Sequence, residues 1–111
     1  MSELVLMKCE HDERRLFVLD EDEIEAHLQM LWGWSIVDDK LTKEFSFPDF
    51  VSGLVFANKI AKIAEQENHH PKICLEWGKV EISLYTHSVE GITKNDFILA
   101  AKIDELIQNK S

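Results

Sequence analysis

Residues 65–96 read EQENHHPKICLEWGKVEISLYTHSVEGITKND, and this stretch decides the fold. A helix-like pattern stops before Pro71, because the residue preceding a proline is pushed away from helical backbone angles. Residues 73–76 and 79–85 then predict two strands, with Gly78 supplying the positive φ of a tight hairpin between them. The stretch therefore predicts the end of one helix followed by an antiparallel hairpin.

The same kind of patterning extends to both sides of this stretch. Carboxylates at residues 20–23 favour a helix start, since they suit the positive end of the helix dipole, and Gly33 is expected to end that helix. The expected order is helix 20–33, strands 34–37 and 41–46, helix 48–68, strands 73–76 and 79–85, and a last helix from about residue 94. Hairpins packed by helices predict an α+β fold with an antiparallel sheet.

The central helix carries an unusually wide apolar surface. One stripe at helical spacing consists of Phe50, Leu54, Ala57, Ala61 and Ala64. A second set broadens it and consists of Phe56, Ile60 and Ile63. A surface of this width predicts burial on more than one side of the helix.

A chain of 111 residues is expected to form one domain. Residues 1–19 are interpreted as an N-terminal extension, in which residues 16–19 form either an extended arm or an edge strand. Residues 20–111 are interpreted as the single domain.

The composition excludes several classes of function. A net charge of -9 without a lysine and arginine stripe argues against direct nucleic-acid binding. No apolar run approaches the ~20 residues that span a bilayer, and residues 1–10 do not resemble a signal peptide. We therefore expect a cytoplasmic protein without membrane partners. Cys9 and Cys74 could pair, but free thiols are favoured without a secretory signal.

Three of the five histidines, His69, His70 and His87, fall in the deciding stretch. Imidazole, with an ordinary pKa of about 6.5, can give and take protons near neutrality, so the cluster suggests proton-transfer chemistry. The structural alternative is that histidines in a last helical turn stabilise the negative helix end. Metal binding is disfavoured, because neighbouring helical side chains at 69 and 70 point in different directions.

Two carboxylates accompany the histidines. Thr93 and Asp96 form a capping-box pattern, which gives Asp96 a structural role and leaves open a second role at the edge of a site. Glu65 precedes His69 by four residues, so both can lie on one helix face. Such a pair is either a surface pair or a carboxylate that orients an imidazole.

Together these residues resemble the pterin-4a-carbinolamine dehydratase family over residues 24–107. The family pattern is an acidic residue, three spacers, His-His-Pro, an aromatic residue, Thr-His, and an aspartate that opens the last helix. Its counterparts here are Glu65, His69-His70-Pro71, Trp77, Thr86-His87 and Asp96. Supporting features are Gly33-Trp34, Phe45, Phe47, Phe50 and Gly91-Ile92-Thr93. The chain departs from the pattern at Asn95, often arginine in the family, and at Trp77, often tyrosine.

The resemblance implies a four-stranded antiparallel sheet with helices packed on one face. It also implies dehydration of a 4a-hydroxytetrahydropterin to the quinonoid dihydropterin, without a metal or redox cofactor. His69 and His87 would be the acid and base, in an order left open, and His70 would bind and orient the pterin. The implied substrate-binding residues are Glu65, Asn68, Pro71, Tyr85, Thr86, Ser88, Asp96 and Trp34, the last by covering the ring.

The resemblance further implies a homo-oligomer, with dimers across sheet edges and tetramers through helix packing. The main alternative function is a non-enzymatic protein-binding module, a dimerisation cofactor, coactivator or assembly factor on the same fold. Retention of all three histidines favours the enzyme. A different pterin substrate is a third possibility.

Overall fold

The computed structural model describes residues 3–108, and their helices and strands confirm the predicted α+β order. The main elements are α1 (Glu21–Leu28), β1 (Ser35–Val37), β2 (Lys40–Ser46), α2 (Phe50–Glu67), β3 (Lys72–Glu76), β4 (Lys79–Leu84) and α3 (Lys94–Gln108). Three short 3-10 turns are η1 (Glu3–Leu6), η2 (Glu13–Arg15) and η3 (His87–Val89).

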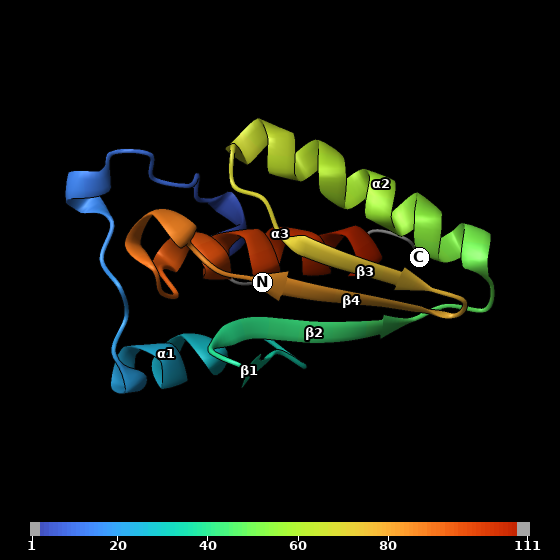
Figure 1. The fold of residues 1–111 in the computed structure, drawn as a ribbon, viewed down its shortest axis with the longest axis horizontal. Coiled ribbons are helices and arrows are strands. Elements are labelled where there is room, and N and C mark those ends of the chain that lie inside the picture. The colour runs from blue at the N-terminus through green and yellow to red at the C-terminus, as the bar shows by residue number, and fades with distance from the viewer. Residues whose placement is uncertain (1–2, 109–111) are drawn as a thin grey trace.

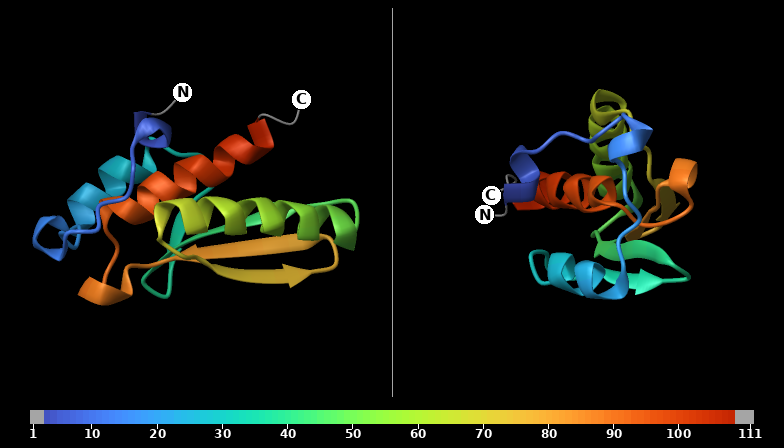
Figure 2. Two further views of the ribbon diagram at one scale, coloured as in Figure 1. Left: turned by 90° about the horizontal axis from the view of Figure 1, so that it is seen from above. Right: turned by 90° about the vertical axis from the view of Figure 1, so that its left-hand side faces the viewer.

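The four strands form one antiparallel sheet in the order β1-β2-β4-β3. Alternate residues of β4, Val80, Ile82 and Leu84, are fully buried, as expected when one face of a strand packs on the core. Figures 1 and 2 show α2 and α3 on the same side of the sheet, and α2 contacts α3, β3 and β4. The expected sheet with helices on one face is therefore confirmed.

Both hairpins turn through positive φ. Gly78 has φ 76° between β3 and β4, as its position in the sequence predicts. Between β1 and β2, Asp38 and Asp39 have φ of 50° and 64°. Two consecutive positive φ values match the twist of a two-residue hairpin, and aspartate tolerates them better than most residues.

The first helix is shorter than predicted. It begins at the Asp20 capping box, in which Asp20 and Glu23 each accept from the other's backbone N–H. It ends at Leu28, and the prediction that Gly33 ends it is wrong. The N–H groups of Met30 and Leu31 bond three residues back, because the chain tightens into turns after Leu28 and then reaches β1.

Helix α2 buries Phe56 and Ile60 of the second predicted apolar set, but only Ala64 of the first stripe. Its buried residues are Gly53, Phe56, Ile60, Ala64 and Glu67. Its exposed apolar face consists of Phe50, Val51, Leu54 and Val55, which are 41–65% exposed. Both stripes have helical spacing, and the sheet covers only one of them. The face led by Phe50 and Leu54 is thus left without a partner in the described part of the chain.

The N-terminal arm, defined as residues 3–19, packs on this fold. Leu4, Val5 and Cys9 are buried in the core, and η1 contacts α3. Residues 16–19 are extended and belong to no strand, so the arm alternative holds, and the N–H of Leu19 donates to the Ile92 carbonyl at 2.9 Å.

Cys9 and Cys74 are both free thiols, as favoured. Among residues 3–108, no helix combines the length and the apolar character needed to cross a bilayer.

Gly91 lies against the N-terminal arm, and a substitution there measures how closely the arm packs on it. A Cβ at Gly91 would lie 2.6 Å from Val18 Cγ1. Gly91→Ala should lower the free energy of unfolding by about 1–3 kcal/mol, because overpacking forces displacement. In a Val18→Ala background the same substitution should cost less than half as much, since the two changes couple through one contact. Urea unfolding of the wild type, the two single variants and the double variant measures these free energies. An equal loss of stability in both backgrounds would contradict the close contact between Val18 and Gly91.

Candidate functional site

The end of α2 places the His69-His70-Pro71 sequence. Asn68 ends the helix in the left-handed conformation, with φ 50°, which asparagine accepts more readily than most residues. The N–H of His69 donates to the Ala64 carbonyl at 3.2 Å. The chain then leaves the helix axis before Pro71, and the two histidine side chains separate.

His69 is held by the buried carboxylate of Asp96 at the start of α3. His69 Nε2 lies 2.6 Å from Asp96 Oδ1, and the two side chains are 11% and 0% exposed. Asp96 Oδ2 accepts two further hydrogen bonds, from the Thr86 hydroxyl and from the Thr93 N–H, both at 2.9 Å. The structure therefore joins three segments of the chain at one carboxylate.

The direction of each hydrogen bond in this network follows from the donors present. Thr86 spends its only hydroxyl proton on Asp96, so in its 2.8 Å contact with Thr93 the Thr93 hydroxyl must donate. The Thr93 oxygen in turn accepts from the Asn95 N–H at 3.2 Å. Asp96 Oδ2 is thus an acceptor in both of its bonds. The direction of the His69 bond depends on the tautomer, and an ionised Asp96, which has no proton to give, requires His69 Nε2 to be the donor.

This arrangement leaves the other nitrogen of His69 for chemistry. Within residues 3–108, His69 Nδ1 has no hydrogen bond. In neutral imidazole with Nε2 protonated, Nδ1 carries a lone pair and can accept a proton. A carboxylate on the opposite nitrogen fixes the tautomer and the ring orientation of the imidazole.

His70 pairs with Glu65 instead of sharing the Asp96 network. Its Nε2 lies 2.5 Å from Glu65 Oε2, and the two side chains are 54% and 77% exposed. The helical spacing of Glu65 suggested contact with His69, but the left-handed residue Asn68 turns the chain and brings His70 to it. Such an exposed pair adds little stability, and both side chains are accessible from solvent.

His87 and Tyr85 flank Thr86 and so lie next to the Asp96 network. The rings of Tyr85 and His87 meet edge to face with centroids 5.1 Å apart. His87 and Ser88 are exposed at the start of η3, whereas Thr86 is buried. The segment just after β4 therefore places the Thr86 side chain in the network, between a half-buried Tyr85 and an exposed His87.

Trp34 lies in another part of the structure. It is 7% exposed, and its indole N–H donates to Asp104 Oδ2 at 2.9 Å. Lys43 Nζ bonds the other oxygen of Asp104, also at 2.9 Å. Asp104 is eight residues beyond Asp96 on α3, about 12 Å along the helix axis. Of the residues expected at the site, Trp34 is the one whose hydrogen bond, to Asp104, places it away from the Asp96 network.

Asp96 performs the capping role and a second role together. Its side chain accepts from the Thr93 backbone, which is half of a capping box, and it also holds His69. Sequence reasoning did not place Thr93 at the site. Thr93 had two signals in the sequence, the capping pattern and its place in Gly91-Ile92-Thr93. Neither shows its contact with Thr86, because that contact joins residues from different elements.

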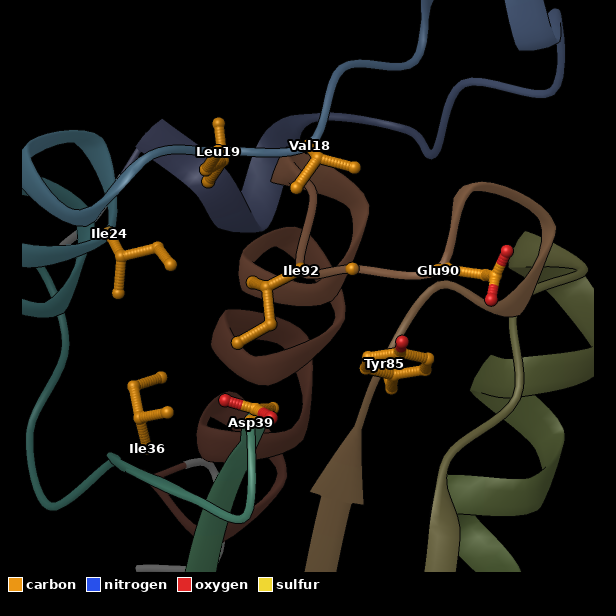
Figure 3. Close-up of a pocket in the computed structure, with 9 residues that line it drawn as sticks. Val18, Leu19, Ile24, Ile36, Asp39, Tyr85, Glu90 and Ile92 are labelled. Carbon is orange, nitrogen blue, oxygen red and sulfur yellow. The ribbon is translucent and has the colours of Figure 1, made fainter.

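A hollow of about 250 Å³ has Tyr85 in its lining. Figure 3 shows its lining, from the N-terminal arm, α1, the β1–β2 hairpin and the loop before α3. The lining residues are Val18, Leu19, Ile24, Ile36, Asp39, Tyr85, Glu90, Gly91 and Ile92. None of the three histidines lines it, so this hollow is distinct from the Asp96 network. Within the described part of the chain, no group of three or more His, Cys, Asp or Glu side chains is placed to hold a metal ion.

Comparison of the sequence with known proteins finds a family model and named relatives that match most of the chain. Residues 18–106 match the family model described as "Pterin 4 alpha carbinolamine dehydratase". A protein of Rubrobacter xylanophilus named "Putative pterin-4-alpha-carbinolamine dehydratase" is 40% identical over 107 residues, covering 96% of this chain and 100% of that protein.

Two solved structures share the fold. One is a transcriptional coactivator/pterin dehydratase from Brucella melitensis, with 34% identity and a TM-score of 0.77 over 81% of this chain and 98% of that chain. The other, a pterin dehydratase-like RuBisCO assembly factor of the alpha-carboxysome, is 24% identical with a TM-score of 0.54 over 68% of this chain and 87% of that chain, and shows the fold alone. Because the family model matches residues 18–106, which are most of this chain, the chain belongs to the pterin 4 alpha carbinolamine dehydratase family.

Proposed function

We propose that this protein removes water from a 4a-hydroxytetrahydropterin and yields the quinonoid dihydropterin by histidine acid–base catalysis. The observation that carries the proposal is the His69–Asp96 pair, in which a nearly buried imidazole is oriented by a buried carboxylate and keeps Nδ1 free. The relatives named above support the substrate class.

The reaction requires two proton transfers. The bond between C4a and the hydroxyl oxygen breaks, and the oxygen leaves as water after gaining a proton. A ring N–H loses its proton to a base, and the electron pair of that bond forms the new C=N bond with C4a. Oxidation state is unchanged, so the residues need to supply only an acid and a base.

We assign these two roles to His69 and His87. His69 is the base, because Asp96 stabilises the imidazolium that forms when Nδ1 accepts the ring-nitrogen proton. His87 is the acid that protonates the leaving hydroxyl, since it follows Thr86 directly and is exposed. His70, with Glu65, binds and orients the pterin. The remaining proposed lining residues are Asn68, Pro71, Tyr85 and Ser88.

A second candidate function is protein binding, which the exposed apolar face of α2 favours. The Brucella melitensis protein, described as a transcriptional coactivator as well as a pterin dehydratase, is a relative of this kind. The same face also supports self-association, and we propose that the protein is at least a homodimer. Burial of Phe50, Val51, Leu54 and Val55 against a second copy would remove that apolar surface from water.

The histidine roles can be separated by single substitutions. His69→Ala and His87→Ala should each lower the turnover number by about 10²-fold or more, as expected for general acid–base groups. His70→Ala should mainly raise KM. The control is His11→Ala, which removes an exposed histidine outside the site. Turnover is followed by loss of the 4a-carbinolamine ultraviolet absorbance, and added chelator should not change it. Near-normal turnover in both key variants would refute the mechanism.

Asp96 is expected to matter for both stability and turnover. Asp96→Ala leaves the donors of His69, Thr86 and Thr93 without their acceptor in a buried site, and should lower the free energy of unfolding by about 2–4 kcal/mol. Asp96→Asn keeps the side-chain volume, so it should fold better yet lose most of the turnover. Urea unfolding and steady-state kinetics measure the two effects. Wild-type turnover in Asp96→Asn would show that Asp96 is only a helix cap.

Self-association is tested through the exposed face of α2. The melting temperature should rise with protein concentration, because association stabilises the folded state by mass action. Leu54→Lys should shift light-scattering mass toward the monomer and abolish that concentration dependence. The matched control is Gln29→Lys, an equal charge change at an exposed position just after α1. A monomer at all micromolar concentrations in the wild type would refute the proposed oligomer.

A further inference from the structure

The N-terminal arm makes a second bridge between the two elements that the His69–Asp96 pair connects. Cys9 N–H donates to Glu67 Oε1 at 2.8 Å, at the end of α2. The next arm residue, Glu10, donates its N–H to Asn95 Oδ1 at 2.7 Å and accepts from Asn95 Nδ2 at 2.8 Å, at the start of α3. Two consecutive residues of the arm therefore join the same two helix ends as the catalytic pair.

The attachment points lie next to the site residues in sequence. Glu67 precedes His69 by two residues, and Asn95 immediately precedes Asp96. At its other end the arm bonds the carbonyl of Ile92 through the N–H of Leu19, one residue before Thr93. We propose that the arm is a strap that sets the distance between His69 and Asp96, with Glu67 and Asn95 as positioning residues.

Burial makes the bridge stiff. Glu67 is 8% exposed and Asn95 is 3% exposed, so water competes little for their hydrogen bonds. The side-chain amide of Asn95 accepts from the N–H of Glu10 and donates to the carbonyl of Glu10. Two hydrogen bonds to the backbone of one residue fix the orientation of the amide. Because both bonds are to arm backbone, the identity of the Glu10 side chain is unimportant to the bridge.

The groups around Glu67 keep its carboxylate ionised, so that it can accept the hydrogen bond from the Cys9 N–H. Burial by itself would raise the pKa of Glu67, but the Cys9 N–H and the Lys102 ammonium, 3.6 Å away, hold that pKa below its usual range. Burial, with the charge of Glu67 beside it, raises the pKa of the Cys9 thiol to about 12. Cys9 is therefore a neutral thiol at neutral pH and does not repel Glu67.

The inference rests on the proposed dehydratase only for its kinetic consequence, and its structural consequence is measured separately. The probe is the imidazole proton of His69, whose hydrogen bond to Asp96 should give a downfield NMR resonance that is slow to exchange with water and is identified by its loss in His69→Ala. In Asn95→Ala this resonance should broaden or vanish, and turnover should fall by about 10-fold, since small misplacements of catalytic groups are costly. KM should stay near the wild-type value.

Two further comparisons separate positioning from general destabilisation. Glu67→Ala should behave as Asn95→Ala does, whereas Glu67→Gln, which keeps an acceptor for the Cys9 N–H, should retain the resonance. Ile103→Val removes one methylene from a buried residue of α3, two turns beyond Asp96, and should leave both the resonance and turnover unchanged. All measurements are made below the melting temperature of each variant.

The outcomes are distinguishable from those that test the function. A normal His69 resonance and normal turnover in Asn95→Ala and Glu67→Ala would overturn the strap. Equal losses in Ile103→Val would also overturn it, because the effect would then be general. Loss of the resonance in Asn95→Ala alongside a wild type that lacks dehydratase activity would support the strap and refute the proposed function.

Discussion

The site depends on one buried carboxylate. Asp96 is fully buried and accepts hydrogen bonds from His69, Thr86 and Thr93. A buried charge is tolerated only when its hydrogen-bonding capacity is met. The loop after α2, the end of β4 and the start of α3 must therefore converge at this point, and any arrangement that moves one of them leaves a buried polar group without its partner.

This requirement explains the unusual features around the site. The left-handed Asn68 takes the chain off the axis of α2 so that His69 can reach Asp96. The Thr86–Gly91 bridge closes the loop that returns the chain from β4 to α3. The arm lies over Gly91, where Val18 leaves no space for a side chain. Asn68 and the Thr86–Gly91 bridge thus each lie beside a hydrogen-bond partner of the same carboxylate.

The core and the site are built from different parts of the same elements. The sheet packs its apolar face on α2 and α3, and Figure 1 shows the end of α2, the end of β4 and the start of α3 toward the same end of the sheet. Helix α2 serves both purposes, because its buried face holds the sheet while its last turn supplies Glu65 and Glu67. Its remaining apolar face, which includes Phe50 and Leu54, belongs to neither and is exposed.

The sequence by itself determined the order of elements, the hairpin at Gly78 and the group of histidines, because turns, periodicity and the helix stop before Pro71 are local effects. It could not determine which apolar stripe of α2 is buried, since both stripes repeat every three to four residues and only the sheet distinguishes them. Nor could spacing show that Glu65 meets His70, that Asp104 holds Trp34, or that the arm bridges Glu67 and Asn95. Each of these contacts joins residues through a turn or across the fold, where side-chain direction depends on tertiary packing and not on neighbours in the chain.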